Sequence, residues 1–353
     1  MTTDPFLIYG ANGYTGSLIA RTAAERGMRP ILAGRSAAAV AALAEPLGLE
    51  QRVFALEQRD ALDAALADMP LVLHCAGPFA HTSRLMAEAC LRTKTHYLDI
   101  TGEAAVFEAL ARRDTQAKAA GIMLLPGAGF DVVPSDCLAA HLKRRMPGAR
   151  RLTLGFLALS RTSWGTASTA VENLHRGGLV RRDGQLISVP AAHRTRTIDF
   201  GRGPTTAVAI PWGDVSTAFY STGIPNIEVY TALSPRLRQL MVASRRFGWL
   251  LGSAPAQRLL KGLIRRQPRG PSDAERARGL SLLWGEVEDA AGARCAARLR
   301  TPDGYTLTAD TALAIAARVL GGQAPAGFQT PAMAYGADFI LEFAGVTRED
   351  LGA

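Results

Sequence analysis

Three glycines near the N-terminus have the spacing of a phosphate-binding loop. Gly10, Gly13 and Gly16 directly follow the apolar segment 6–9 and precede a helical pattern. Glycine permits a tight turn and lets backbone N–H groups approach an anion, which the N-terminus of the next helix also favours. The loop predicts a dinucleotide site with G-x-x-G-x-x-G spacing in place of G-x-G-x-x-G, and the alternative is a glycine turn without a ligand. The residues expected to contact the cofactor are Gly10, Ala11, Asn12, Gly13, Tyr14, Thr15 and Gly16.

The end of the second predicted strand discriminates between the two nicotinamide dinucleotides. NAD-binding sites usually carry Asp or Glu here to bind the ribose 2′-OH, but this chain has Arg35 and Ser36. Arginine pairs well with phosphate, and a serine can donate to phosphate or cap the following helix. We therefore expect NADP(H), with Arg35 and Ser36 at its 2′-phosphate. The alternative is a solvated arginine beside a helix cap.

A loop of small residues follows the fourth predicted strand, 71–75. Ligands of doubly wound folds bind at the carboxyl ends of the strands, so this loop is expected to lie along the cofactor. It consists of Ala76, Gly77, Pro78 and Phe79. His74 and Cys75 belong to the apolar strand itself, where packing is the more common role, and we assign them no catalytic function.

Carboxylates follow the fifth and sixth predicted strands. Asp99 ends one strand and Asp131 follows the other, so both are expected at the same sheet edge. Carboxylates in a cleft can orient a hydroxyl or exchange protons if their pKa values are raised, which makes these two the candidate catalytic residues. Thr101, Gly102 and Glu103 are expected to bind substrate. The alternative for Glu103 is a first-turn carboxylate that complements a helix dipole.

Strand and helix patterns alternate along the first 125 residues, which predicts an α/β fold with a Rossmann-type doubly wound parallel sheet. The predicted strands are 6–9, 31–33, 53–55, 71–75, 97–100 and 122–125. The predicted helices are 14–26, 37–47, 61–67, 84–92 and 104–120.

The pattern changes near residue 147 to alternating, turn-rich segments. These predict a second, α+β domain on a largely antiparallel or mixed sheet, with a later helix at 310–320. Its predicted strands are 151–159, 185–189, 205–210, 228–233 and 296–308. We expect an NADP-binding domain at 1–147, a substrate and dimerisation domain at 148–308, and a C-terminal helical segment, 309–353, that returns to the first domain.

The segment 236–266 is helical in pattern and both basic and apolar. One interpretation is a pair of helices packed on the second sheet, which is the usual role of an apolar helical stripe and the one we favour. The other is an amphipathic segment that rests on a membrane surface or covers a substrate.

Charge and composition limit the partners of the 353-residue chain. Its 40 Lys and Arg exceed its 31 Asp and Glu by nine, which favours anionic partners such as phosphorylated cofactors. The basic residues are scattered, so we expect no nucleic acid partner. Four widely separated cysteines indicate a reduced, cytoplasmic compartment and no metal site. No apolar run reaches the length of a membrane span.

Several of these motifs together resemble the saccharopine dehydrogenase-like oxidoreductases, in particular a bacterial branch similar to trans-acting enoyl reductases. The motifs are 10–16, 33–36, 76–79, 97–103 and the run Gly127-Ala-Gly-Phe-Asp-Val-Val-Pro-Ser-Asp136. The resemblance implies an NADP(H)-binding Rossmann domain, a second domain, and hydride transfer in the cleft between them. It also points to Gly129 and Phe130, and to Gly165 and Thr166 before a helix, as substrate-binding residues.

The resemblance implies reduction of a C=C bond in an apolar acyl or polyketide-like small molecule, which suits the aromatic and leucine-rich segment 212–263. Two alternatives remain: a saccharopine-type C=N oxidoreductase acting on an amino acid, and an NADP(H)-binding regulatory protein without turnover. No tyrosine is followed by lysine four residues later, which argues against a short-chain dehydrogenase. A homodimer and membrane contact through 236–266 are the further partners considered.

Overall fold

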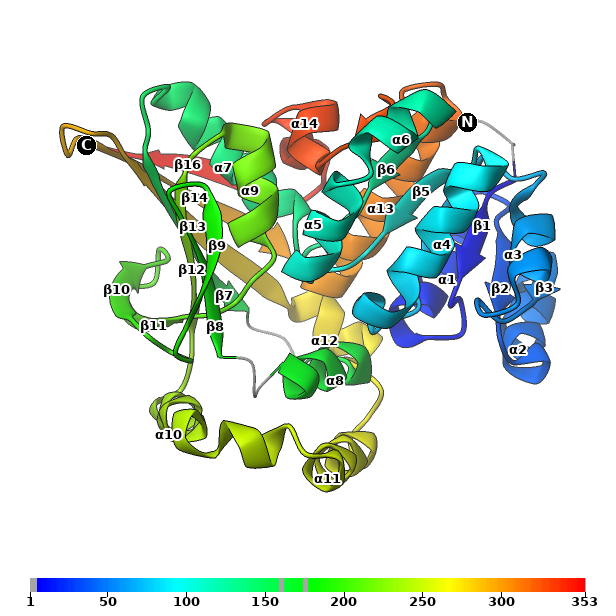
Figure 1. The fold of residues 1–353 in the computed structure, drawn as a ribbon, viewed down its shortest axis with the longest axis horizontal. Coiled ribbons are helices and arrows are strands. Elements are labelled where there is room, and N and C mark those ends of the chain that lie inside the picture. Colours follow the sequence, from blue (N-terminus) through cyan, green and yellow to red (C-terminus); the bar gives the residue numbers. More distant parts are fainter. Residues whose placement is uncertain (1–4, 159–161, 174–176, 353) are drawn as a thin grey trace. The chain divides into compact units, whose positions relative to one another are not determined.

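The chain forms two units, each built on its own β-sheet (Figure 1). Unit 1 comprises Met1–Val133 and Tyr305–Ala334, and unit 2 comprises Pro134–Gly304 and Tyr335–Ala353. The structure is a computed structural model that describes residues 5–158, 162–173 and 177–352. The two units are described separately below.

The sheet of unit 1 is parallel and has the order β15-β6-β5-β4-β1-β2-β3. Its strands are β1 (Leu7–Tyr9), β2 (Ile31–Gly34), β3 (Gln51–Val53), β4 (Leu71–His74), β5 (His96–Asp99), β6 (Met123–Leu125) and β15 (Gly327–Phe328). The chain runs from β1 outward to β3, then returns to β4 and continues outward in the other direction. The order therefore reverses between β1 and β4, and the carboxyl edge at that point is where doubly wound folds bind ligands.

Helices connect these strands and cover the sheet. They are α1 (Tyr14–Glu25), α2 (Ala37–Leu47), α3 (Arg59–Leu66), α4 (Phe79–Thr93), α5 (Ala104–Ala111), α6 (Asp114–Ala120), α13 (Gly304–Leu320) and α14 (Pro331–Tyr335). Helix α1 packs beside α2, whereas α3, α4 and α5 form a second group. Right-handed crossovers on either side of the reversal require two such groups on opposite faces. The predicted Rossmann-type fold is confirmed.

The sheet of unit 2 is mixed and has the order β10-β11-β12-β7-β13-β14-β16, with β8 pairing with β12 and β9. Strands β7 and β12 are parallel and the other pairs are antiparallel. The strands are β7 (Arg151–Ala158), β8 (Gly178–Arg182), β9 (Gln185–Val189), β10 (Thr195–Asp199), β11 (Pro204–Ala209), β12 (Asn226–Ala232), β13 (Leu280–Glu288), β14 (Arg294–Pro302) and β16 (Thr347–Leu351). The predicted mixed sheet of an α+β domain is also confirmed.

One buried cluster of unit 2 lies between the β10–β11 hairpin and the middle of the sheet. Ile198 and Phe200 pack with Tyr230, Leu282 and Trp284 in one buried cluster, so the hairpin curls over a face of β12 and β13. The helices of the unit are α7 (Val133–Arg145), α8 (Trp164–Asn173), α9 (Asp214–Thr222), α10 (Pro235–Leu251), α11 (Ala254–Arg265) and α12 (Asp273–Arg278), with a 3₁₀ turn η1 (Phe339–Glu342).

The unit boundaries differ from those predicted. Unit 1 ends at Val133 and not at 147, because α7 packs on the sheet of unit 2: a Cβ at Gly285 would lie 2.7 Å from Leu142 and 3.2 Å from Leu138. The C-terminal segment 309–353 also divides. Its first part adds β15 to the sheet of unit 1, whereas β16 pairs with β14 in unit 2 and is a strand where a helical segment was expected.

The basic segment 236–266 forms two helices with a break at Gly252 and Ser253. Helix α11 packs against α8 and against α10. Among the described residues, no helix has both the length and the apolar run needed to cross a bilayer.

Candidate cofactor-binding site

The loop between β1 and α1 is a tight turn that requires glycine at two positions. Gly10 has a φ of +81°, and a Cβ there would lie 2.7 Å from the backbone nitrogen of Ala76. A Cβ at Gly16 would collide with the carbonyl oxygen of Gly10. The loop is closed by a hydrogen bond from Gly13 N–H to Gly10 O (3.0 Å). The backbone can therefore approach a ligand closely, as a pyrophosphate requires.

The start of α1 suits an anion. Gly13 occupies the N-cap position and has no side chain with which to cap the helix, and residues 14–17 contain no carboxylate. The first N–H groups of an α-helix lack intrahelical acceptors and carry the positive end of the helix dipole. These donors fit the pyrophosphate of a dinucleotide, so the predicted loop 10–16 has the chemistry and the space for this cofactor group.

Arg35 lies at the carboxyl end of β2, next to this loop. A Cβ at Gly34 would lie 3.1 Å from Asn12 Oδ1, so the end of β2 and the glycine loop adjoin. Arg35 is exposed, and within 5–158, 162–173 and 177–352 the structure gives its guanidinium no hydrogen bond or ion pair. Ser36 accepts a 3.4 Å hydrogen bond from Ala39 N–H and caps α2, which is the alternative that its position allowed. A hydroxyl that accepts a hydrogen bond can still donate one, so Arg35 and Ser36 both stay predicted partners of a 2′-phosphate.

The loop 76–79 is held against the glycine loop by Glu103. The carboxylate accepts hydrogen bonds from Phe79 N–H (2.8 Å) and Ala80 N–H (3.0 Å), which are the first donors of α4. Glu103 was predicted to bind substrate and was also weighed as a carboxylate at the start of its own helix. The structure instead places it at the N-terminus of α4, where a negative charge is stabilising.

His74 is buried in β4 and linked to the same loop by Thr82. The Thr82 hydroxyl donates to Ala76 O (2.7 Å), so His74 Nε2, 2.9 Å from Thr82 Oγ1, must be the donor in their hydrogen bond. Burial lowers the pKa of His74 to about 3, which keeps the ring neutral. The ring also packs edge-on against Phe79. His74 therefore orders the loop as a neutral donor, which agrees with the packing role expected of it.

Asp99 is a fully buried carboxylate that joins the ends of β5 and β6. It accepts hydrogen bonds from the Tyr97 hydroxyl (2.6 Å) and from the N–H groups of Thr101 and Gly127 (2.9 Å each). Burial raises its pKa to about 6 despite these donors. Because the residue is 0% exposed, it has no surface with which to touch a substrate. Its geometry is that of a positioning residue and not of the catalytic residue that we expected.

Asp131 keeps access to the surface of unit 1. It is partly buried, and desolvation raises its pKa to about 6. A Cβ at Gly102 would lie 3.0 Å from Asp131 Oδ2, so the carboxylate rests on the backbone at the end of β5. The predicted proximity of Asp131 to the 101–103 segment is therefore present, with Gly102 supplying the space.

The other predicted substrate-binding residues of unit 1 make contacts that fix this edge, and their assignment to substrate stays a prediction. Phe130 N–H donates to Thr308 Oγ1 (3.0 Å), and a Cβ at Gly129 would lie 2.7 Å from the Thr308 methyl. Thr101 is buried and accepts a hydrogen bond from Glu103 N–H (3.1 Å). Sequence reasoning missed Thr82 and Thr308, because hydroxyls inside helices give no local signal of the distant loops that they hold.

Gly165 and Thr166 belong to unit 2, whereas every other predicted site residue belongs to unit 1. Both lie in the first turn of α8, and Gly165 is exposed. The helix start is anchored by Trp164, whose Nε1 donates to Gln267 O (2.8 Å). Their assignment to substrate stays a prediction.

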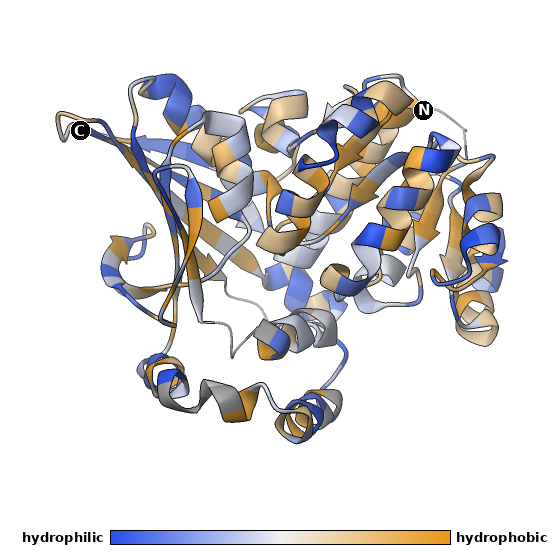
Figure 2. Cartoon of the chain, in the orientation of Figure 1, coloured by the Kyte–Doolittle hydropathy of each residue, from blue (hydrophilic) through white to orange (hydrophobic). Residues whose placement is uncertain are grey.

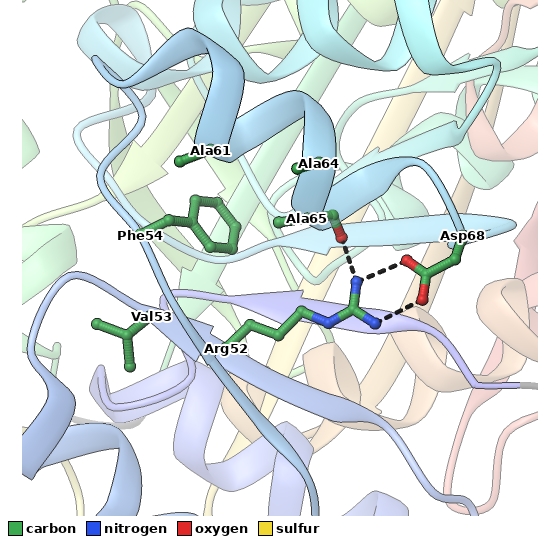
Figure 3. A pocket seen from close by; sticks show the side chains of 7 residues that line it. All are labelled: Arg52, Val53, Phe54, Ala61, Ala64, Ala65 and Asp68. Atoms are coloured by element: carbon green, nitrogen blue, oxygen red, sulfur yellow. Dashed lines mark hydrogen bonds and ion pairs between the residues drawn. The ribbon is translucent and has the colours of Figure 1, made fainter.

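One hollow of unit 1 lies elsewhere, between β3 and α3 (Figure 3). It has a volume of about 390 Å³ and is lined by Arg52, Val53, Phe54, Ala61, Ala64, Ala65 and Asp68. Arg52 is already engaged there, since it forms a bidentate pair with Asp68 (2.6 Å) and donates to Ala65 O. None of the predicted cofactor residues lines this hollow, and we assign it no ligand.

Comparison with known proteins supports the cofactor assignment. Residues 6–125 match the family model described as the saccharopine dehydrogenase NADP binding domain. Two curated relatives, each named "Trans-acting enoyl reductase", come from Mycobacterium leprae and Mycobacterium ulcerans. The first is 34% identical over 148 residues, 40% of this chain and 35% of the relative. The second is 32% identical over 147 residues, 39% of this chain and 35% of the relative.

The similar region covers about 35 to 40% of the length of each of these curated relatives. A solved structure is similar over the whole chain: saccharopine dehydrogenase (L-Glu forming) from Saccharomyces cerevisiae, at 15% identity. It covers 99% of this chain and 100% of its own, with a TM-score of 0.68, which shows a shared fold. The resemblance inferred from the motifs is thus confirmed: residues 6–125 of this chain are similar to saccharopine dehydrogenase NADP-binding domains.

Proposed function

We propose that this protein is an NADP(H)-dependent oxidoreductase that reduces a C=C bond of an apolar acyl or polyketide-like substrate. The observation that carries the proposal is the glycine loop at the reversal of the parallel sheet, with the free Arg35 beside it. The C=C reaction rests on the names of the mycobacterial relatives. The apolar class of substrate rests on the aromatic and leucine-rich segment 212–263. Bound NADPH would supply the hydride.

The residues of unit 1 divide the binding of NADP(H) between them. The N–H groups of 10–16 receive the pyrophosphate at the start of α1, and Arg35 receives the 2′-phosphate. The loop 76–79, which abuts Gly10 and is fixed by Glu103 and Thr82, lines the cofactor at the next strand end. Asp99 positions the backbone of Thr101 and Gly127.

Asp131 is the group of this edge that is best suited to hold a proton for the substrate. Addition of a hydride to one carbon of a C=C bond leaves charge that a proton must neutralise. A carboxyl whose pKa is raised to about 6 holds that proton in a useful fraction of molecules near neutral pH. The partial exposure of Asp131, which Asp99 lacks, makes contact with substrate feasible.

Two competing functions share the same cofactor site. A C=N oxidoreductase is suggested by the fold shared with saccharopine dehydrogenase, but fold alone does not determine the reaction. A regulatory NADP(H)-binding protein would use the same loop without turnover. The C=C assignment is preferred because the relatives named for enoyl reduction are 34 and 32% identical to this chain over 148 and 147 residues.

In the test, the purified protein is titrated with NADPH and with NADH, and binding is measured by nicotinamide fluorescence. Enoyl thioesters and imines are then supplied separately while loss of NADPH absorbance is recorded. We expect tighter binding of NADPH and consumption of NADPH with enoyl thioesters. Turnover with imines only would replace the C=C assignment, binding without turnover on either class would favour the regulatory function, and absence of binding would refute the cofactor site.

A further inference from the structure

We propose that α10 and α11 dock unit 2 on an anionic lipid surface. The exposed leucine stripe of α11, with exposed apolar side chains of α10, would enter the boundary between headgroups and acyl chains. Arginines of the two helices would pair with lipid phosphates. We call residues 235–265 the basic helix pair. The proposal concerns unit 2 only and is independent of the cofactor site in unit 1.

Exposed leucines concentrate on the basic helix pair. In the described part of the chain, nine large hydrophobic side chains are exposed, and five of them lie on α10 and α11. Leu259 is 65% exposed and Leu263 48%. These two are four residues apart and therefore share one side of α11. The other three are Leu237, Val242 and Leu250. Figure 2 shows hydrophobic and hydrophilic residues alternating around α11.

The longer stretch 234–272, which contains the basic helix pair, is strongly positive. Residues 234–272 contain nine of the 40 Lys and Arg of the chain and none of its 31 Asp and Glu. The rest of the chain therefore has 31 basic and 31 acidic residues, so the whole net charge of +9 comes from this segment. Such a segment is attracted to anionic lipid, with about 1 kcal/mol for each basic residue near the surface.

The inner side of the basic helix pair is attached to unit 2 by polar contacts. Lys261 pairs with Glu172 of α8, and Gln257 donates to Val171 O (3.0 Å). Arg245 of α10 donates to the carbonyl oxygens of Ala191 and Ala192 (2.7 Å each). These contacts fix which side of α11 faces the protein. Arg258 and Arg266 stay exposed. Arg258 directly precedes Leu259, and Arg266 lies three residues after Leu263.

A lipid surface fits this patch better than a second copy of the chain. Two basic helix pairs facing each other would bring together two segments without a single carboxylate, and the like charges would repel. Nucleic acid would pair with the arginines but offers no apolar layer for the exposed leucines. An amphipathic helix lying in the interface satisfies both, because leucines enter the acyl boundary while arginine side chains extend to the phosphates.

The experiment is co-sedimentation of the full chain with vesicles of phosphatidylcholine alone or mixed with phosphatidylglycerol, at low and high salt. We expect binding only to the mixed vesicles and release by salt. The L259Q/L263Q variant should lose at least about tenfold in partitioning, and R258Q/R266Q about 30-fold. The matched controls are I187Q/L341Q, which removes two exposed apolar side chains elsewhere, and R182Q/R202Q, which removes two exposed arginines of unit 2.

Several outcomes would overturn the proposal. One is failure of the unmodified chain to bind mixed vesicles at low salt, and another is an equal loss in the control variants. Retention of vesicle binding by L259Q/L263Q, together with binding to DNA, would identify a simple polyanion site. A change from dimer to monomer in L259Q/L263Q, measured by sedimentation velocity without lipid, would identify a second copy as the occupant. Thermal unfolding of each variant verifies that unit 2 is folded.

Discussion

Glu103 caps a helix that begins 24 residues before it. Its Oε1 accepts a 2.8 Å hydrogen bond from the N–H of Phe79, the first residue of α4, and its Oε2 accepts one from Ala80. The loop after β5 is thereby tied to the loop after β4. Since Ala76 in turn packs against Gly10, the 76–79 segment links Glu103 to the glycine loop.

Replacement of Glu103 should weaken both folding and cofactor binding. The E103A variant leaves two N–H groups of α4 without their acceptor, and we expect a loss of about 1–2 kcal/mol in the free energy of unfolding. The E103Q variant keeps one amide oxygen as acceptor and should lose less. Urea unfolding and the Kd for NADPH measure the two effects.

The control for Glu103 is E45A, which removes an exposed glutamate of α2. It should leave the Kd for NADPH unchanged. If E103A binds NADPH with the affinity of the unmodified chain, the Glu103 cap of α4 does not influence the cofactor loop, and the proposed connection between them is wrong.

A single methyl group at Gly16 should disrupt the glycine loop. The Cβ of a G16A variant would collide with Gly10 O and lie 3.0 Å from Ala11 Cα, both of which belong to the loop backbone. The loop must shift away from the pyrophosphate, so we expect the Kd for NADPH to rise by tenfold or more, roughly the effect of one lost charged contact. The G148A variant is the control, because a Cβ at Gly148 meets nothing within 4 Å. Equal affinities of G16A and G148A would mean that this loop does not hold the cofactor.

Arg35 should determine the preference for NADPH over NADH. In the R35D variant a carboxylate replaces the cation proposed to bind the 2′-phosphate and repels it, so NADPH affinity should fall by about 100-fold or more. NADH affinity should be retained or improve, because Asp can bind the 2′-OH. The control is R29D, which makes the same charge change at an exposed arginine before β2. Parallel loss of both cofactors in R35D would contradict the assignment to the 2′-phosphate.

Local sequence patterns predicted most of unit 1 because its elements alternate in short, strongly apolar segments. Helix α2 agrees residue for residue with the prediction at 37–47, and β2 and β4 differ from theirs by one residue. Strand β15 was missed, since two residues far from the rest of the sheet give no periodic signal. In unit 2, β8, β10, β13 and β16 were missed, and the strand expected at 296–308 runs into α13, because mixed sheets are assembled from distant segments.

The cofactor residues were more predictable than the substrate residues for a physical reason. A phosphate loop needs glycines at fixed spacing next to a strand and a helix, so its signal is local. The roles of Glu103 and Asp99 depend on partners brought close by folding: α4 for one, and the backbone at 101 and 127 for the other. The sequence gives the two residue types. It does not give the folded partners that make Glu103 a helix cap and Asp99 a buried hydrogen-bond acceptor.

Asp131 should give the protein a pH dependence that can be isolated by substitution. Its pKa is raised from 3.8 to about 6 by burial, so between these values the folded chain binds more protons than the unfolded chain. The contribution of Asp131 to the free energy of unfolding therefore falls as the pH rises from about 4 to about 6, by at most about 3 kcal/mol. The D131N side chain is neutral throughout, so this decrease should be absent from it. Urea unfolding across this range, compared with D60N at an exposed aspartate, tests the difference.

The same carboxyl should control turnover if it holds the proton for the substrate. Activity with NADPH should then decline as the pH rises above about 6, while D131N should be much less active and have no inflection there. The stability and activity measurements separate two roles of the residue. If the stability profile changes in D131N but kcat and its pH profile do not, Asp131 is a desolvated structural carboxylate and the proton must come from another group or from water. If the pH profiles of stability and of kcat both change in D131N, the Asp131 carboxyl, whose desolvation destabilises the fold, is also the group that supplies the proton in the reaction.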